Sequence, residues 1–379
     1  MSARPLFPRR GYILLISGIL IGFLLFAGIS LIFSGFGQRP TSTVKPESIE
    51  FEFLYTSEKQ GWIERVTPGF EQWFEDEFDI SVKVRLTVTG THKTVNLILL
   101  GGAKPTVWSP ASSIWIPYLN SKWMREGHED VIAEDWVPLA TSPVVIAGWS
   151  SSLSRYNISS FDDLYQLSER NVDFKYGHPD PLLSNGGAMV VVLEIAEALQ
   201  EKPDEITLED LKKPEVVEYV RTIETHSVAY GESTGFFGSW AAENGPKAID
   251  LFGVYENVVI DNSLKASKKW EDRIVAVYPE KGTLLCDHPY VILDAEWVSE
   301  WQRFAASQYL IYLLQPDVQK IAQEYGLRPA NPSAPLDEEL FSEENGVQLK
   351  IPVPIFNPPS GEVLEAIFVE WVKARNPGA

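Results

Sequence analysis

The chain has 379 residues, 45% of them hydrophobic and 22% charged, and a formal net charge of −20 at pH 7. This length predicts two lobes or domains rather than a single core, and the acidic balance, without a basic run, excludes nucleic acid and anionic lipid surfaces as partners of the folded body. The single cysteine, Cys286, excludes an intrachain disulfide and a cysteine metal knuckle, and we expect no metal or cofactor.

An apolar segment without a charged residue occupies residues 11–37, directly after an N-terminus that contains Arg4, Arg9 and Arg10. At ~1.5 Å per residue, a helix over 12–36 would be roughly 37 Å long, which is enough to cross a ~30 Å hydrocarbon layer with some tilt. A cleaved signal peptide is the open alternative, although its apolar core is usually only ~7–15 residues long.

The charge pattern around this segment predicts the topology. We expect a transmembrane helix or signal anchor at 11–37, a cytoplasmic N-terminus at 1–10, and a single-pass protein of the cell membrane whose soluble body is extracytoplasmic. Residues 38–48 are polar and contain prolines, which predicts a short linker between membrane and body.

The first part of the body alternates predicted strands and helices. Residues 49–55 and 80–88 alternate apolar and polar side chains and predict strands, and 105–112 predicts a third, short one. Apolar side chains within 65–78 and 91–102 have helical spacing. The resulting β-α-β-α-β order predicts an α/β fold with a mostly parallel sheet covered by helices.

The same rules extend the assignment to the end of the chain. Predicted strands occupy 141–149, 172–181, a strand end at 258–264, and two stretches within 273–294. Predicted helices occupy 161–167, 189–199, 207–224 as one capped helix or a pair, a segment opened by the turn at 231–235, a pair within 299–329, and 361–374.

Hydroxyl and glycine residues recur where the predicted strands turn into helices. In an open parallel sheet, ligands bind beyond the carboxyl ends of the strands, where helix N-termini offer free N–H groups and partial positive charge. Each turn alone is equally explained as an ordinary helix cap, but together they predict one binding site. Its candidate ligand-binding residues are Thr56, Ser57, Thr89, Thr91, Ser109, Ser112, Ser184, Asn185, Gly186, Ser233 and Thr234.

Several of these stretches together resemble a known family. Tyr55-Thr56-Ser57, TVWSPAS, HPDPLLSNGG, YGESTGFF, AVYPEKGT and GLRPANP are similar to segments of type II periplasmic binding proteins, in particular the family 1 extracellular solute-binding proteins of ABC transporters. The resemblance implies a two-lobed fold with a central cleft, in which the lobes close around a ligand by a hinge.

The resemblance also implies a division of the chain. Lobe 1 would comprise 49–145 plus 276–330 and lobe 2 would comprise 150–273. The chain would cross between the lobes near 144–149 and 274–278, and 331–379 would form a C-terminal extension with a closing helix.

The chemistry of the ligand stays open. Hydroxyls at helix N-termini suit an oxyanion such as molybdate, sulfate or phosphate, and Lys59 and Lys93 lie next to the turns. Glu58 and Glu232 would oppose an anion and favour a cation. Aromatic side chains near the turns suit sugars or organic cations; they are Trp62, Trp108, Trp115, Trp149 and Trp240.

Three classes of function were weighed. The first is a membrane-tethered solute-binding protein that captures a small molecule or oxyanion for an ABC permease, and the second is a ligand-free adaptor or sensor that binds a protein partner. The third is an enzyme, for which Cys286-Asp287-His288 and His178 offer candidate groups. We expect no enzyme, because neighbours on a strand point to opposite faces and no nucleophile, base and orienting group share a motif.

Overall fold

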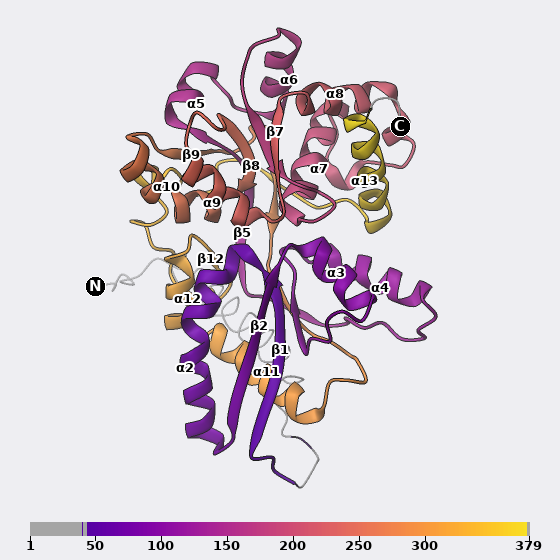
Figure 1. Cartoon of the computed structure of the whole chain (residues 1–379), viewed down its shortest axis with the longest axis vertical. Helices are drawn as coiled ribbons and strands as arrows, with labels where there is room; N and C mark the ends of the chain where they lie inside the picture. The colour runs from indigo at the N-terminus through magenta and orange to yellow at the C-terminus, as the bar shows by residue number, and fades with distance from the viewer. Residues whose placement is uncertain (1–39, 41–43, 377–379) are drawn as a thin grey trace, which may run out of the picture.

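The computed structural model describes residue 40 and residues 44–376 of the chain. They form two lobes stacked along the long axis of the molecule, with lobe 1 below and lobe 2 above in Figure 1. The predicted α/β fold with two lobes is therefore confirmed for these residues.

No helix within the described residues is long and apolar enough to cross a bilayer. The predicted cytoplasmic segment 1–10 and membrane segment 11–37 lie outside the described residues, as do 38, 39 and 41–43 of the predicted linker.

Lobe 1 is built on a five-stranded sheet with the order β2-β1-β3-β11-β4. Its strands are β1 (Ser48–Thr56), β2 (Ser81–Thr89), β3 (Val107–Ser109), β4 (Trp136–Pro138) and β11 (Pro289–Ile292). Strand β1 is parallel to β2 and β3, whereas β11 is antiparallel to β3 and β4. The helices of this lobe are the 3₁₀ turn η1 (Ser57–Lys59), α2 (Gln60–Phe78), α3 (Thr91–Leu99), α4 (Trp115–Arg125), α11 (Glu300–Leu313) and α12 (Pro316–Gln323).

Aromatic side chains from the sheet, α2 and α11 dominate the core of lobe 1. The ring of Tyr309 lies 4.6 Å from Phe70 and 5.9 Å from Phe53, measured between centroids, and Tyr290 lies 5.5 Å from Phe53. Such aromatic pairs contribute about 0.5–1.5 kcal/mol beyond the burial of their area. This core holds β1 in place, and the last residue of β1, Thr56, therefore has a fixed position at the end of the sheet.

Strand β5 (Ala140–Trp149) connects the lobes. It is almost entirely buried, as its apolar sequence requires for a strand covered on both faces. Its partners from its beginning to its end are β12 (Arg328–Pro329), β10 (Thr283–Cys286), β8 (Leu251–Tyr255) and β9 (Ile274–Val277), and β13 (Ile355–Phe356) adds to β10. The chain returns towards lobe 1 between β9 and β10.

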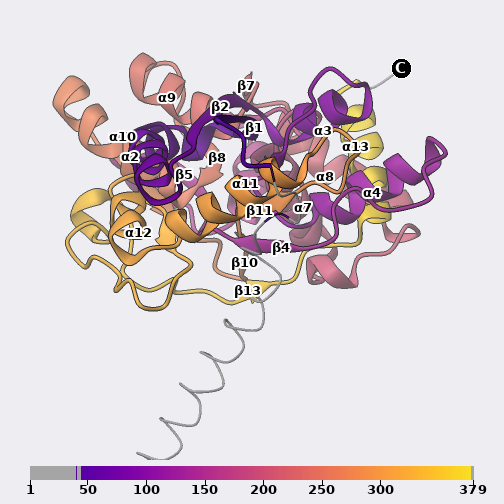
Figure 2. The ribbon, with the colours of Figure 1, turned by 90° about the horizontal axis from the view of Figure 1, so that it is seen from below.

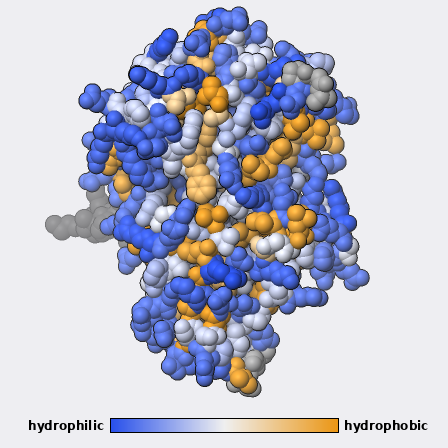
Figure 3. Space-filling view, viewed as in Figure 1, coloured by the Kyte–Doolittle hydropathy of each residue, from blue (hydrophilic) through white to orange (hydrophobic). Residues whose placement is uncertain are grey.

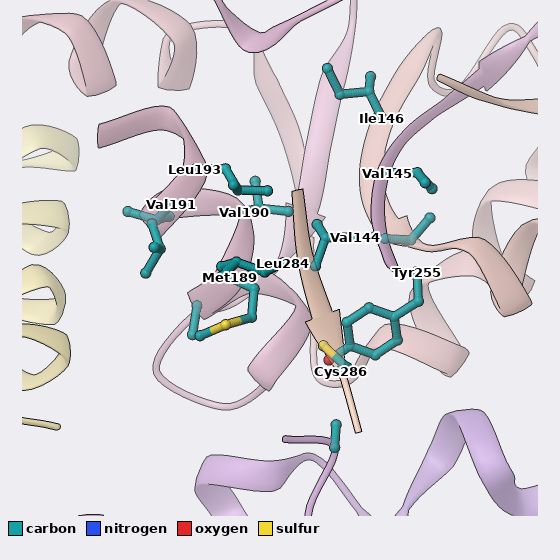
Figure 4. Packing of buried hydrophobic residues seen from close by; sticks show 14 of the residues in the cluster. Val144, Val145, Ile146, Met189, Val190, Val191, Leu193, Tyr255, Leu284 and Cys286 are labelled. Carbon is teal, nitrogen blue, oxygen red and sulfur yellow. The ribbon is translucent and has the colours of Figure 1, made fainter. Parts of the chain in front are cut away.

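Lobe 2 surrounds the second half of β5 and the parallel pair β6 (Tyr176–Pro179) and β7 (Ser227–Gly231). Its helices are α5 (Ser150–Tyr156), α6 (Phe161–Glu169), α7 (Asn185–Leu199), α8 (Pro214–Glu224), α9 (Thr234–Asn244), α10 (Glu256–Trp270) and α13 (Gly361–Arg375), with 3₁₀ turns η2 (Pro203–Glu205), η3 (Asp210–Lys212) and η4 (Glu343–Asn345). Helix α7 is apolar on every side and is buried from Asn185 to Glu197. Figure 4 shows Val190 beside Val144 of β5, so α7 packs directly on the connecting strand.

Two predictions of secondary structure were wrong. Residues 258–264 are not a strand end but part of α10, because a short β-branched run fits a buried helix as well as a strand. Residues 273–294 contain three strands rather than two. The interruption falls at Asp287 and His288, where the left-handed backbone of His288, with φ of 42°, breaks the strand.

Candidate functional site

The strand ends of the two lobes face each other where the lobes meet, as Figure 1 shows. Strands β1, β2 and β3 of lobe 1 end near the first turns of α2, α3 and α4, and strands β6 and β7 of lobe 2 lead into α7 and α9. The structure buries every candidate ligand-binding residue: Thr56, Ser57, Thr89, Thr91, Ser109, Ser112, Ser184, Asn185, Gly186, Ser233 and Thr234.

Ser57 of lobe 1 and Ser233 of lobe 2 touch directly. Their Oγ atoms lie 2.7 Å apart, and the N–H of Gly235 in the first turn of α9 donates to Ser57 Oγ at 3.2 Å. Close by, Asn257 Nδ2 donates to the backbone carbonyl of Glu58 at 3.2 Å. The lobes are therefore closed on each other here, and two hydroxyls that the sequence separates by 176 positions lie together.

The first turn of α3 contacts the loop that precedes α7. The N–H groups of His92 and Lys93 donate to the carbonyl of Leu183 at 3.1 and 3.4 Å. A β-carbon at Gly90, the N-cap of α3, would collide with the carbonyl oxygens of Leu183 and Glu232. At the rim, Lys93 Nζ and Glu232 Oε1 form an ion pair of 2.5 Å between half-exposed side chains.

The lobe 2 side of the cleft has a network of hydroxyl and amide groups. Ser184 Oγ lies 2.9 Å from Thr234 Oγ1, which links the starts of α7 and α9. Asn185 Nδ2 donates to the Tyr255 hydroxyl at 2.6 Å and contacts Cys286 Sγ at 3.2 Å. These groups are positioned by two helix N-termini, each of which supplies further N–H groups.

Asn185 also reaches lobe 1, because Trp115 Nε1 donates to its Oδ1 at 2.7 Å. Next to it, a β-carbon at Gly186 would collide with the Thr234 side chain. Gly186 thus serves the close packing of α7 against α9, and Gly187 serves the close packing of α7 against the loop at Pro179 and Pro181.

The remaining predicted hydroxyls in lobe 1 belong to its own turns. Thr91 Oγ1 accepts from the N–H of Ala111 at 3.2 Å, and Ser112 Oγ accepts from the N–H of Ile114 at 3.5 Å. Thr89 is buried at the end of β2. The structure therefore brings Ser57, Ser184, Asn185, Ser233 and Thr234 together, and gives Thr91 and Ser112 local partners.

A cluster of buried charged side chains, which was not predicted from the sequence, lies in lobe 1 directly after the end of β1. Lys59 Nζ is 2.6 Å from Thr56 Oγ1, 3.1 Å from Glu58 Oε1 and 3.3 Å from His288 Nδ1. His288 Nδ1 is also 3.2 Å from Glu58 Oε1, and Thr56 Oγ1 hydrogen bonds to the same carboxylate. We call Glu58, Lys59 and His288 the lobe 1 cluster.

Glu58 is ionised and His288 is neutral in this cluster. Burial alone would raise the pKa of Glu58, but the Lys59 ammonium and hydrogen bonds from His288 and Thr56 hold it below its usual range. Burial, aided by Lys59, lowers the pKa of His288. Among the described residues, neither His288 Nε2 nor the buried Ser109 Oγ at the end of β3 has a hydrogen-bond partner.

The segment from Cys286 to His288 is not one strand, so the earlier argument from opposite strand faces does not apply to it. Strand β10 ends at Cys286, Asp287 Oδ1 accepts from the N–H of Ser113 at 2.7 Å, and His288 turns back into the cluster. Burial raises the pKa of the Cys286 thiol, which opposes a role as nucleophile.

His178, the other histidine among the candidate groups for an enzyme, is held inside lobe 2. Its Nε2 lies 3.0 Å from Glu224 Oε1 and its Nδ1 lies 2.7 Å from the carbonyl of Pro179. Both ring nitrogens therefore have partners within the lobe.

The tryptophans near the turns are mostly packing residues. Trp62 Nε1 donates to Val318 O, Trp108 Nε1 donates to Thr94 Oγ1, and both rings are fully buried. Trp240 stacks on Phe237 within lobe 2. Trp115 and Trp149 are fully buried as well, so four of the five rings have no exposed face on which a sugar could stack.

A hollow of about 290 Å³ opens between the lobes beside the Ser57–Ser233 contact. Its lining includes Ser57 and Gln60 of lobe 1 and Gly235, Phe236, Ser239 and Asn257 of lobe 2. This hollow gives solvent a path to the edge of the buried hydroxyl network.

The sequence matches a known family over most of its length. The family model of bacterial extracellular solute-binding proteins matches residues 53–328. No curated protein gives a significant match to the chain.

Solved structures with the same fold cover nearly the whole body. A periplasmic thiamin binding protein is 13% identical with a TM-score of 0.59, covering 90% of this chain and 100% of its own. The sulfate-binding protein SubI from Mycobacterium tuberculosis is 17% identical with a TM-score of 0.56, covering 83% and 94%. The spermidine/putrescine-binding protein PotD from Streptococcus pneumoniae is 14% identical with a TM-score of 0.56, covering 87% and 100%. At these identities the likeness concerns the fold alone.

Proposed function

Because the chain belongs to the family of bacterial extracellular solute-binding proteins, we propose that it captures a small solute between its two lobes and delivers it to an ABC-type importer. The observation that carries this proposal is the contact between Ser57 and Ser233, whose Oγ atoms lie 2.7 Å apart at the N-terminal ends of helices from separate lobes. A hinged pair of lobes that closes on hydroxyl groups is suited to enclose a small polar molecule.

We propose the ligand site among the candidate residues at the lobe interface. Ser57, Ser184, Ser233 and Thr234 would supply hydroxyls, Asn185 would supply its amide, and Ser109 would supply the hydroxyl that has no partner in the described chain. Thr56, Thr89, Thr91, Ser112 and Gly186 would shape the turns that hold these groups.

An oxyanion is the ligand class that this chemistry favours. The first turns of α3, α7 and α9 direct N–H groups and partial positive charge towards the interface. Glu58, which would repel an anion, is compensated by Lys59 within the same lobe. Hydroxyls and backbone N–H groups can surround a small tetrahedral anion without a full countercharge.

The test is a thermal-shift screen of the purified protein against sulfate, molybdate and phosphate, with sugars and polyamines as further arms. A ligand that binds the folded state raises the melting temperature in proportion to its saturation. A shift with an oxyanion supports the proposal, and a shift only with a sugar or polyamine would replace the ligand class. No shift in any arm would favour the alternative, a ligand-free adaptor or sensor that binds a protein partner.

The site is tested by the double substitution Ser184→Ala with Ser233→Ala. The matched control is Ser168→Ala, since Ser168 is also buried in lobe 2 but donates to Leu164 O within α6. We expect the double variant to lose about tenfold or more in affinity for the solute while the control does not. Equal affinity in all three proteins would remove both serines from the site.

We also propose that residues 11–37 anchor the protein in the cell membrane with residues 1–10 in the cytoplasm and the body outside it. The charge-free length of this segment and the arginines before it support the proposal. Full-length protein should then resist carbonate extraction from membranes. Recovery in the soluble fraction with a new N-terminus near residue 38 would identify a cleaved signal peptide instead.

A further inference from the structure

Helix α13 lies across the outer side of the lobe interface. Its residues, Gly361–Arg375, follow the stretch 53–328 that the family model matches. Figures 1 and 2 both show α13 beside α8 of lobe 2, with α3 and α4 of lobe 1 next to it. The helix therefore contacts both lobes at once.

The attachment of α13 to lobe 2 is buried and hydrogen bonded. Trp371 is 2% exposed, and its Nε1 donates to the carboxylate of Glu224 in α8. The guanidinium of Arg375 lies 3.9 Å from the ring centroid of Tyr230, and Arg221 Nε donates to the carbonyl of Ala374 at 3.3 Å. Separating this end would leave a buried carboxylate short of a donor, which is costly.

The attachment of α13 to lobe 1 depends mainly on one ring. Phe368 stacks on His92 and Trp115 with centroid distances of 5.2 and 5.9 Å and interplanar angles of 24° and 18°. Burial lowers the pKa of His92 to about 4, so its ring is neutral at pH 7 and suits this apolar contact.

One half-exposed carboxylate adds an ionic contact with α4 of lobe 1. Glu365 pairs with Lys122 and, at 3.5 Å, with Arg125. Exposed ion pairs of this kind contribute only about 0–1 kcal/mol, so Phe368 is the main link between α13 and lobe 1.

The residues beneath Phe368 are the ones that meet lobe 2 at the cleft. Trp115 Nε1 donates to Asn185 of lobe 2, and the N–H of His92 donates to Leu183 of lobe 2. If the lobes separate about β5, these bonds break and α13 can remain on only one lobe. Its buried attachment to lobe 2 is the stronger of the two.

We propose that α13 is a latch: it stays fixed to lobe 2 and holds lobe 1 in the closed position through Phe368 and Glu365. Opening of the cleft then requires Phe368 to leave the His92–Trp115 surface. The latch sets how readily the cleft opens, whichever solute occupies it.

The single cysteine provides a reporter of opening. Cys286 is 1% exposed and is covered from lobe 2 by Asn185, whose Nδ2 lies 3.2 Å from its Sγ. Separation of the lobes removes Asn185 and exposes the thiol, so the rate at which a maleimide labels native protein measures the opening equilibrium.

The test compares labelling rates of full-length wild type, Phe368→Ala and Val369→Ala without any added solute. Val369 lies on the same helix but is 52% exposed, which makes its substitution the matched control. We expect labelling of Phe368→Ala to be about fivefold faster or more, with a larger radius of gyration in small-angle X-ray scattering, and no change in the control. Glu365→Gln should give a smaller increase, about twofold.

An unchanged labelling rate in Phe368→Ala would overturn the latch. So would faster labelling that rises with urea as steeply as global unfolding does, because the thiol would then react only in unfolded chains. The measurement uses no solute, so its failure leaves the proposed solute binding standing, and failure of the solute screen leaves the latch standing.

Discussion

Each lobe buries a cluster of ionisable side chains, and the two clusters differ in how completely their polar atoms are paired. The lobe 2 cluster consists of His178 and Glu224, which lie 3.0 Å apart with side chains at most 2% exposed. Glu224 also accepts from Trp371, Ser227 and Tyr230. The lobe 1 cluster is equally buried, but it leaves His288 Nε2 without a partner among the described residues.

The location of the clusters explains this difference. The lobe 2 cluster lies under α13, where both ring nitrogens of His178 and the Glu224 carboxylate are paired and hold the helix, while the neighbouring buried Glu194 Oε2 has no partner among the described residues. The lobe 1 cluster lies at the end of β1, and its unpaired buried ring nitrogen costs free energy in the folded protein unless a further group reaches it. The full pairing of His178 and Glu224 indicates a structural role for these two residues.

Removing His178 should give the largest loss of stability. The substitution His178→Gln leaves Glu224 buried without its cationic partner, and we expect the free energy of unfolding to fall by about 3–5 kcal/mol. Urea denaturation measures the loss, with His226→Gln as the control, because the partly buried His226 ring stacks on Phe174 and bonds to its carbonyl but has no ion pair among the described residues. A loss below about 1 kcal/mol would show that the pair does not stabilise lobe 2.

The same pair should make stability depend on pH. Burial alone would lower the pKa of His178, but Glu224 raises it to about 9, so the folded protein holds a proton that the unfolded chain releases near 6.5. The stabilisation is complete below pH 6.5 and is lost as pH rises through 9. We expect the free energy of unfolding to drop by up to about 1.4 kcal/mol per pH unit across this range.

The control for this pH dependence is the His178→Gln variant. Glu194, whose pKa is raised to about 8 by burial and then by Glu224, has the same sign of effect and persists in the variant. The slope between pH 6.5 and 9 should therefore be shallower in His178→Gln, and equal slopes would assign the effect to Glu194 together with Glu197, whose pKa burial raises to about 7.

Altering His288 should have a moderate effect on stability. Asn tolerates the left-handed backbone of residue 288, with φ of 42°, so His288→Asn removes the imidazole without adding strain. We expect a loss of about 1–2 kcal/mol, smaller than for His178 because only Nδ1 is engaged. If His288→Asn lowered the free energy of unfolding as much as His178→Gln does, the two clusters would contribute equally to stability despite their different hydrogen-bond pairing.

The smallest effect is expected for Ser109. Its buried hydroxyl has no partner among the described residues, so Ser109→Ala should change stability by less than about 0.5 kcal/mol. Ser142 is the matched control, since its buried Oγ accepts from the N–H of Asn257 at 3.1 Å and Ser142→Ala should cost about 1–3 kcal/mol. Similar losses in both variants would mean that Ser109 is paired after all.

The sequence was sufficient to predict the β-α-β-α-β order at the start of the body and the hydroxyl turns that lead into α7 and α9. Alternation and helical spacing are local properties, and Ser184, Asn185 and Ser233 lie at turns that those properties define. Their approach across the lobes depended on the family resemblance, because contacts between residues 176 positions apart have no local signature.

The lobe 1 cluster could not be predicted in the same way. Glu58 and Lys59 directly follow a strand and look like a solvated turn, and only the packing of β11 against β3 brings His288 to them. Asp287, His288 and Pro289 do interrupt the apolar residues of TLLCDHPYVI, but nothing in these residue types indicates that the histidine takes a left-handed backbone and turns into a buried cluster.

Gly90 allows the two lobes to approach each other closely in the closed form. Its backbone, with φ of −72° and ψ of 151°, is open to any residue, so only the carbonyl groups of Leu183 and Glu232 in the opposite lobe demand a glycine. The methyl group added by Gly90→Ala would collide with these two carbonyl groups, and it would therefore favour the open arrangement of the lobes while leaving each lobe intact. One hydrogen atom in place of a side chain thus decides how far the two halves of the molecule can approach.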